Sequence, residues 1–283
     1  MNSFITQSPA KINLFLKVVG KRANGYHEII SLMSRIDLFD VLTLSFEQPS
    51  ITIRCSNPRV PEGKNNLAYK AASFFFEALP SSNGVDVWIE KVIPVAAGLG
   101  GGSSNAASVL MALNQHYGLP FSNMKLMEMG QKIGADVPFF LLRHSAIVSG
   151  IGEKLEKFQG MPPLSAVLVC PNIEVSTKWV YESLNLPLTK SGKNFTIQDF
   201  REDPFRMLKS LSNDLEAVTV ARFPEINNIK QRLLELGAQV ASMSGSGPSV
   251  FGLFEDLEKA SMAFQAMKHQ ECGDIFLVSL LLP

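Results

Sequence analysis

Cysteine is scarce in this sequence, and an excess of charge and long apolar runs are absent from it. The three cysteines, Cys55, Cys170 and Cys272, are odd in number, widely spaced and form no CxxC pair. This pattern argues against a disulfide framework and against a zinc site. The simplest expectation is three reduced thiols, buried as small apolar side chains.

The charges balance, with 26 Lys plus Arg against 26 Asp plus Glu. A chain without net charge has no general attraction for nucleic acid or for an anionic membrane, so a small-molecule partner is favoured. No apolar run approaches the roughly 20 residues needed to cross a bilayer, and the start of the sequence lacks the charged and apolar segments of a signal peptide. We therefore expect a cytoplasmic protein, and the sequence carries no signal for an oligomeric state.

The length of 283 residues allows one large domain or two medium ones, and 46% hydrophobic residues with 18% charged is typical of a globular protein. Strands and helices are mixed along the chain and do not alternate strictly, which favours an α+β fold. We prefer two domains, residues 1–160 and 161–283. The boundary is placed at Met161-Pro162-Pro163, just before the apolar run SAVLVCP, which is typical of a buried strand.

Periodicity predicts the individual elements, because apolar residues alternate in strands and recur at three to four residues in helices. Short strands and turns are expected from Gly134 to Gly160, and a loop with short helical turns at 186–205. The other expected strands are 10–20, 30–48, 50–56, 84–96, 165–171, a pair around a Ser/Gly loop within 238–254, and 275–281. The expected helices are 65–79, 103–118, 123–134, 225–237 and 256–269.

The stretch IPVAAGLGGGSSNAAS, residues 93–108, stands between an expected strand and an expected helix and contains almost only small side chains. Glycines leave room for a phosphate to approach backbone N–H groups at the positive end of a helix, and serines add hydroxyl groups. A tightly packed turn is the alternative. A P-loop would need a lysine after its second glycine, and a dinucleotide loop would open the first βαβ unit, so neither familiar motif fits.

Lys11 and Asp136 are the candidate reactive side chains. Lys11 lies in an apolar strand, where its ammonium either extends to solvent or pairs with a carboxylate. Asp136 follows Gly134 in GADVP and is either a turn or capping aspartate or a rigidly held general base. A Lys11–Asp136 pair would keep the carboxylate ionised. Asn13 shares the strand face of Lys11.

Tyr26 and His27 adjoin the expected turn at Asn24-Gly25. Such residues are often structural, but an aromatic ring and an imidazole on a loop are also suited to stacking on a pyrimidine and binding its polar edge.

Three segments resemble the motifs of the GHMP kinases, the superfamily of galactokinase, homoserine kinase and mevalonate kinase: SPAKINLFL, PVAAGLGGGSSNAA and SMSGSGPSVFGLF, which occur in the expected order over almost the whole chain. The resemblance implies a two-domain fold, with a ribosomal-protein-S5-like N-terminal domain and a ferredoxin-like C-terminal domain. The extra glycines, RANGYHEI and GADVPFF are similar to one member of this superfamily, which implies transfer of the ATP γ-phosphate to the 2-hydroxyl of a cytidine-diphosphate derivative.

The resemblance also implies roles for single residues. Lys11 and Asp136 would be the catalytic residues, with ATP and Mg²⁺ bound. The sequence shows no dedicated acidic ligand for Mg²⁺ at the loop, and Ser104 with water molecules would suffice. The cytidine substrate would contact Asn13, Tyr26, His27, Asp136, Thr177 and Tyr181. ATP would contact Asn66, Leu67, Lys91, Pro94, Gly98, Leu99, Gly100, Gly101, Gly102, Ser103 and Ser104, and the Ser244–Ser249 loop would close the site. Asn66 has an alternative role as a helix cap.

Three other interpretations remain open. Another GHMP kinase would act on homoserine or a mevalonate derivative, but such small substrates give Tyr26 nothing to stack on. A nucleotide-responsive binding protein would have no need of Lys11 and Asp136. An RNA-binding module is disfavoured by the neutral charge balance.

Overall fold

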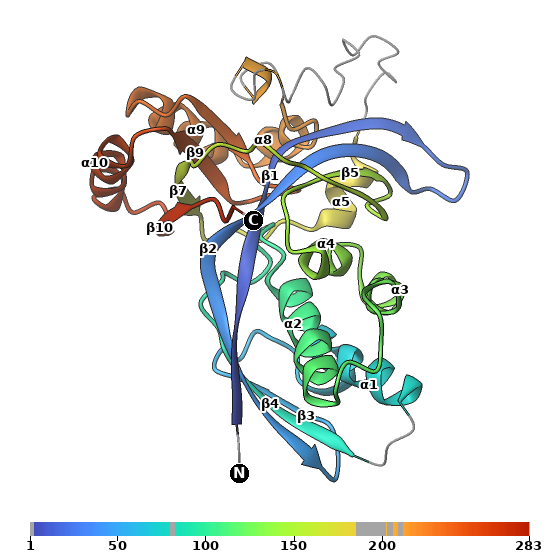
Figure 1. Cartoon of the computed structure of the whole chain (residues 1–283). Coiled ribbons are helices and arrows are strands. Elements are labelled where there is room, and N and C mark those ends of the chain that lie inside the picture. Colours follow the sequence, from blue (N-terminus) through green and yellow to red (C-terminus); the bar gives the residue numbers. More distant parts are fainter. Residues whose placement is uncertain (1–2, 80–82, 185–201, 203–205, 209–211, 283) are drawn as a thin grey trace. The chain divides into compact units, whose positions relative to one another are not determined.

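The computed structural model describes residues 3–79, 83–184, 202, 206–208 and 212–282. The chain forms two compact units (Figure 1). The bounds of the first unit are Met1–Ala10, Leu38–Val95 and Gly100–Arg143. Those of the second unit are Lys11–Asp37, Ala96–Leu99 and His144–Pro283. The long strands β1 (Ser3–Lys21) and β2 (His27–Gln48) contribute residues to both units.

The first unit combines strands with a group of helices. Val41 to Gln48 of β2 pairs antiparallel with β4 (Gly84–Glu90), and β3 (Thr52–Cys55) pairs parallel with β4. A short 3₁₀ turn at Gly63–Asn65 precedes the helices. These are α1 (Leu67–Ala78), α2 (Gly101–His116), α3 (Asn123–Ile133) and α4 (Val137–Leu142). Because α2 is rich in small and apolar residues, it is buried along most of its length and packs against the other three helices.

The second unit contains two sets of strands. In one set, Ile29 to Met33 of β2 pairs antiparallel with β5 (Ala146–Gly150), which pairs with β6 (Lys154–Lys157). The other set is a four-stranded antiparallel sheet in the order β10-β7-β9-β8. Its strands are β7 (Ser165–Cys170), β8 (Val240–Met243), β9 (Val250–Phe254) and β10 (Asp274–Ser279).

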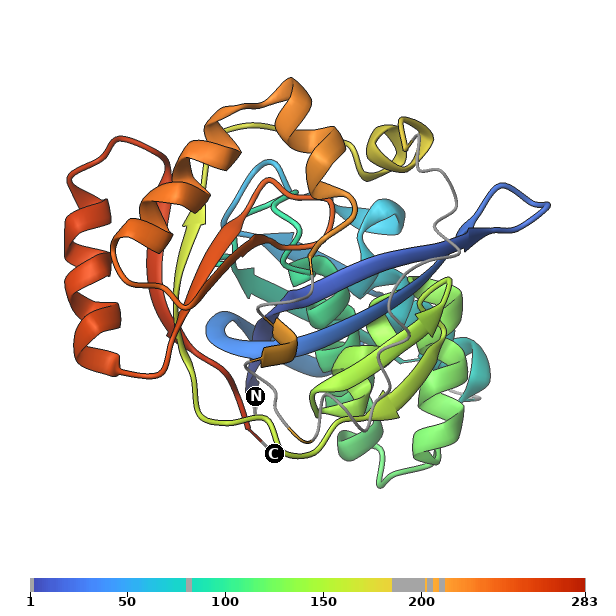
Figure 2. The ribbon, with the colours of Figure 1, turned by 90° about the horizontal axis from the view of Figure 1, so that it is seen from above.

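Helices α9 (Glu225–Glu235) and α10 (Leu257–Lys268) pack on this four-stranded sheet (Figure 2). Leu233 of α9 and Met267 of α10 belong to the same buried cluster as Val167 and Val169, which alternate along β7 and share one of its faces. The order of strands and helices is that of a ferredoxin-like split βαβ fold. Helices α5 (Thr177–Glu182) and α8 (Glu216–Arg222) complete the described elements of this unit.

Most of the predicted elements are present, and several local predictions need correction. The strand expected at 10–20 begins seven residues earlier, at Ser3, and helices α5 and α8 were not predicted. The strand expected at 84–96 ends at Glu90, because the chain then leaves the sheet. The predicted helix at 103–118 begins two residues earlier, at Gly101. The apolar segment after Asp136 is helix α4 where short strands were expected, and a proline in the first turn is typical of a helix start. The predicted loop at 186–205 lies outside the described residues except for position 202.

The cysteines are all free thiols, but only Cys170 is buried, whereas Cys55 and Cys272 are half-buried. Burial raises the pKa of the Cys170 thiol to about 12. No helix among the described residues is long and apolar enough to cross a membrane.

Candidate functional site

The start of α2 presents several backbone amide groups in the first unit. Gly100, which precedes the helix, has a φ of 70° and therefore adopts the left-handed conformation that glycine permits. The amides of Gly101, Gly102 and Ser103 lie in the first turn, where an α-helix has no internal acceptors for them. Together with the helix dipole, these donors favour a bound phosphate.

The two serines of this turn differ in what they can offer a ligand. Ser104 is completely buried, accepts a 2.8 Å hydrogen bond from the Ser8 hydroxyl and donates its amide to the Gly100 carbonyl at 2.9 Å. Ser103 is only half-buried. Of these two serines, only Ser103 therefore has exposed surface.

Two other predicted residues lie beside this turn. A methyl group placed on Gly102 would lie 3.7 Å from Leu67 Cδ1, and one placed on Gly134 would lie 3.9 Å from Ser103 Oγ. Asn66 caps α1, since its side-chain oxygen accepts the amide hydrogen of Ala68 at 2.8 Å. The capping interpretation of Asn66 is therefore confirmed.

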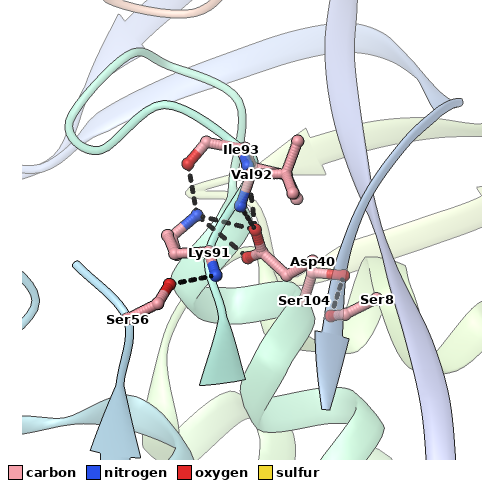
Figure 3. A network of polar contacts seen from close by, with 7 residues as sticks. All are labelled: Ser8, Asp40, Ser56, Lys91, Val92, Ile93 and Ser104. Atoms are coloured by element: carbon pink, nitrogen blue, oxygen red, sulfur yellow. Dashed lines mark hydrogen bonds and ion pairs between the residues drawn. The ribbon is translucent and has the colours of Figure 1, made fainter.

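Lys91 is held by other protein groups (Figure 3). Its Nζ donates to both carboxylate oxygens of Asp40, at 3.1 and 2.9 Å, and to the carbonyl oxygen of Ile93. Burial lowers the pKa of the Lys91 ammonium, and the charge of Asp40 opposes this change. Pro94, which follows this network, is half-buried.

Asp136 lies directly before α4 and is half-buried. Its side chain makes no capping hydrogen bond to this helix, so the capping interpretation of Asp136 is wrong. The turn before it is closed by the Val137 amide, which donates to the Gly134 carbonyl at 3.1 Å. Gly134, two residues before Asp136, lies close to Ser103, since a methyl group placed on it would be 3.9 Å from Ser103 Oγ.

Lys11 and Asn13 lie on one face of β1 in the second unit, as their spacing predicted. Both are at least 95% buried. Lys11 Nζ donates to Asn13 Oδ1 at 2.5 Å, and Asn13 Nδ2 donates to the hydroxyl of Ser31 at 2.8 Å. Because the amide is held on both sides, it fixes the direction of the lysine side chain.

The loop Ser244–Ser249 contacts these two residues. Ser244 Oγ accepts a hydrogen bond from the backbone N–H of Asn13 and donates one to the Gly98 carbonyl, each at 3.2 Å. A methyl group placed on Gly245 would lie 3.2 Å from Asn13 Oδ1 and 3.7 Å from Lys11 Nζ. The glycine thus allows the backbone of the loop to approach the lysine closely.

The first residues of the Gly-rich stretch join the same group. Leu99 is buried, and its carbonyl accepts the Lys11 amide hydrogen at 3.0 Å. Gly98 has a φ of +77° and lies directly against the backbone of Ser244 and Gly247. In the second unit, three separate parts of the sequence therefore meet at Lys11: β1, residues 98–99 and the Ser/Gly loop.

Two of the residues predicted to bind the cytidine group, His27 and Tyr181, contact each other in the second unit, and Thr177 lies on the same helix as Tyr181. The rings of His27 and Tyr181 are stacked, with centroids 5.4 Å apart and planes at 27°. Thr177 Oγ1 lies 2.7 Å from Ser246 Oγ in the Ser/Gly loop. Tyr26 is 61% exposed at the turn between β1 and β2. Burial, and then the charge of Lys21, lowers the pKa of His27, so the imidazole is neutral at pH 7.

The predicted Lys11–Asp136 pair falls on residues of different units, and it stays a prediction. Among the described residues there is no group of three or more His, Cys, Asp and Glu side chains that would hold a metal ion.

The sequence analysis missed two buried polar residues beside the candidate sites. Asn213 donates its side-chain amide to the carbonyls of Met243 and Gly245, at 2.8 and 2.6 Å, and so fixes the Ser/Gly loop. Asp40 holds Lys91. Asp40 carries a signal, because it occupies a buried position in the apolar alternation of β2. Asn213 carries none, since its neighbours in the sequence show no periodic apolar pattern around it.

Family comparisons agree with this fold. The model of the GHMP kinases N terminal domain matches residues 66–144, and that of the GHMP kinases C terminal domain matches residues 197–272. A homoserine kinase from Cytophaga hutchinsonii has a TM-score of 0.79 at 20% identity, covering 99% of this chain and 95% of its own, and so shares the fold. The fold is that of the GHMP kinases, which are small-molecule kinases.

Relatives that match over nearly the whole chain identify the kinase family more closely. A 4-diphosphocytidyl-2-C-methyl-D-erythritol kinase from Syntrophotalea carbinolica is 48% identical over 279 residues, 98% of both chains. One from Geobacter metallireducens is 45% identical over 281 residues, 99% of both chains. A crystal structure of 4-(cytidine 5'-diphospho)-2C-methyl-D-erythritol kinase has a TM-score of 0.84 at 36% identity, over 98% of this chain and 99% of that one. The chain therefore belongs to the 4-diphosphocytidyl-2-C-methyl-D-erythritol kinase family of GHMP kinases.

Proposed function

We propose that this protein transfers the γ-phosphate of ATP to the 2-hydroxyl of 4-diphosphocytidyl-2-C-methyl-D-erythritol, in the non-mevalonate synthesis of isoprenoid precursors. The observation that carries the proposal is 48% identity to a relative of that name over 98% of both chains. Homoserine and mevalonate are weaker candidates, because homoserine and mevalonate kinase structures that share the fold are 14–20% identical to this chain. The predicted location in the cytoplasm stays a prediction.

ATP would bind with its phosphates at the start of α2, where the amides of Gly101, Gly102 and Ser103 supply donors. Asn66, Leu67, Lys91 and Pro94 would lie on the adenosine side, as the family resemblance implies. Mg²⁺ fits this arrangement as a cation carried by the phosphates and water, with the hydroxyl of half-buried Ser103 as the protein ligand, because Mg²⁺ keeps several waters in such sites. The Ser104 hydroxyl, which the sequence also suggested, is completely buried and bonded to Ser8. Its chemistry would be to neutralise charge on the phosphates.

Catalysis would fall to Asp136 and Lys11. The Asp136 carboxylate would accept the proton of the 2-hydroxyl while that oxygen forms a bond to the γ-phosphorus, and the bond to the leaving ADP breaks. The Lys11 ammonium, directed by Asn13, would stabilise negative charge near the transferred group.

The cytidine end of the substrate would bind at His27, Tyr181 and Thr177. The stacked pair of His27 and Tyr181 offers a flat surface for a base, and the exposed ring of Tyr26 offers a second one. The neutral imidazole of His27 has one acceptor and one donor nitrogen for the polar edge of a pyrimidine.

Product analysis tests the proposal. Incubation with ATP, Mg²⁺ and the cytidine-diphosphate alcohol should yield ADP and one new phosphomonoester, and phosphorus and proton NMR should locate it on the 2-hydroxyl. Phosphorylation at another hydroxyl, or none, would contradict the proposed reaction.

Asp136→Asn should lower turnover at least about a hundredfold, because the amide cannot accept the proton. The dissociation constants of ATP and of the acceptor should change by less than about threefold, since the shape of the side chain is kept. Rapid-quench kinetics and calorimetry measure the two effects separately. Turnover close to that of the unchanged enzyme would remove Asp136 from the role of base.

Tyr26→Ala should weaken binding of the cytidine acceptor by about 1–3 kcal/mol if the ring stacks on the base. Tyr26→Phe is the matched control, because it keeps the ring and should bind the acceptor nearly as well. Calorimetric titration with the acceptor gives both values. Equal affinities in all three proteins would exclude stacking on Tyr26.

A further inference from the structure

We propose that Asp40 is a positioning residue for the nucleotide, which acts through Lys91, Val92 and Ile93 on the start of α2. The inference rests on the proposed binding of ATP at that helix end. Asp40 lies on β2, and its side chain is fully buried.

The Asp40 carboxylate gathers its donors from one short segment (Figure 3). Oδ1 accepts the amide hydrogens of Val92 and Ile93, at 2.9 and 2.8 Å, and both oxygens accept from Lys91 Nζ. Because charge-assisted hydrogen bonds in a buried setting are strong, the geometry of these three residues is tightly fixed.

This segment is where the chain leaves the sheet. Strand β4 ends at Glu90, and the ladder that pairs it with β2 ends there too. From Lys91 on, Asp40 and the hydroxyl of Ser56, which accepts the Lys91 amide hydrogen at 2.8 Å, take the place of sheet partners. Asp40 thus sets the direction in which the chain enters the Gly-rich stretch.

The same segment lies against the start of α2. A methyl group placed on Gly101 would lie 3.0 Å from Lys91 Nζ and 3.1 Å from Ile93 Cγ2. Real Cβ atoms rarely have contacts this short, so the glycine fits closely against the network. A shift of Lys91 or Ile93 would therefore displace the first turn of the helix, whose amides are the proposed phosphate donors.

Lys91 balances the charge of Asp40. Its three N–H groups are matched by two carboxylate oxygens and the Ile93 carbonyl, and its side chain is 5% exposed. The ammonium therefore neutralises the buried charge of Asp40, and it contributes to nucleotide binding by holding this segment in place. Loss of either partner would leave a buried charge without compensation.

Asp40→Asn tests the inference, because it keeps the shape but turns one acceptor into a donor that faces Lys91. The dissociation constant of ATP, measured by calorimetry without acceptor, should rise at least about tenfold. KM for the cytidine acceptor and kcat at saturating ATP should stay within about twofold. The double variant Asp40→Asn with Lys91→Met removes both charges and should recover thermal stability without recovering ATP affinity. It allows the same measurement if Asp40→Asn alone does not fold.

Val85→Ala is the matched control, since Val85 is fully buried at the opposite end of β4 from Lys91. It should lower the melting temperature and leave ATP affinity unchanged. Asp40 variants that lower the melting temperature but bind ATP like the unchanged enzyme would overturn the inference. Absence of phosphate transfer in the unchanged enzyme, with ATP still bound, would refute the proposed function and leave this test intact.

Discussion

Gly98 and Gly118 have the same φ of +77° but different surroundings, and the pair isolates the effect of close packing at the loop. Around Gly118, no atom of the described residues lies within 4 Å of an added methyl group. At Gly98 the methyl group would overlap the Ser244 carbonyl oxygen and approach that of Gly247 at 3.0 Å. Neither carbonyl is a flexible group, because both belong to the backbone.

Gly118→Ala should therefore destabilise the protein only by the strain of a left-handed alanine, about 1–3 kcal/mol. Gly98→Ala should cost more and should also weaken ATP binding. Chemical denaturation and calorimetry of the two variants measure this difference. Equal losses of stability, with unchanged ATP affinity, would show that the contact with Ser244 is unimportant.

The lowered pKa of His27 gives a pH dependence with a definite sign. The unfolded chain has the ordinary value, about 6.5, and so binds more protons than the folded state around and just below that pH. The neutral imidazole and its contribution to stability are therefore present above this pH and are lost as the pH falls through the lowered value.

KM for the cytidine acceptor should accordingly be constant above about pH 6.5 and should rise at lower pH, because protonation removes the acceptor nitrogen. His27→Gln should abolish the dependence. Initial rates from about pH 5 to 8 test this, with KM for ATP measured in parallel as the control. A rise that persists in His27→Gln would assign the titration to another group.

At the scale of elements, the N-terminus of α1 combines stability with the proposed nucleotide site. Asn66→Ala removes the cap of α1 and should cost about 1 kcal/mol of stability. Ser122→Ala removes the corresponding cap of α3, where Ser122 Oγ accepts the Lys125 amide hydrogen, and is a control of similar cost. Only Asn66→Ala should also raise the dissociation constant of ATP, by about tenfold, as calorimetry would detect. An equal effect of both variants on ATP would mean that Asn66 is a cap and nothing more.

Sequence patterns predicted the elements best where apolar residues recur at helical spacing, as in α9 and α10, and where a cap residue marks the start of a helix, as at Asn66. They failed for α4, because VPFFLL is apolar at every position and such a run fits a strand or a buried helix equally well. They also missed the end of β4, because Lys91 to Ala96 continue its alternation while the contacts that turn the chain away come from Asp40, 51 residues earlier. Contacts at that separation leave no local signal.

For the whole molecule, the class of enzyme could be predicted because three motifs with separate physical roles occur in one order. The meeting of Lys11, Leu99 and Gly245 could not, since it depends on how distant strands and loops pack in the second unit. The family resemblance indicated which residues belong to the site, and the structure showed the hydrogen-bond partners of Lys11, Asn13 and Lys91. Neutral net charge fits a small-molecule substrate, which brings its own phosphate charges to a local group of donors.

The most direct test of the central claim is the rate of phosphate transfer from ATP, in the presence of Mg²⁺, to three acceptors under the same conditions: 4-diphosphocytidyl-2-C-methyl-D-erythritol, homoserine and mevalonate. We predict that kcat/KM for the cytidine compound exceeds the values for homoserine and mevalonate at least about a hundredfold. A site built to bind cytosine cannot form its contacts with the base when the acceptor is a small aliphatic alcohol. Comparable or faster transfer to homoserine or mevalonate would contradict the proposed substrate.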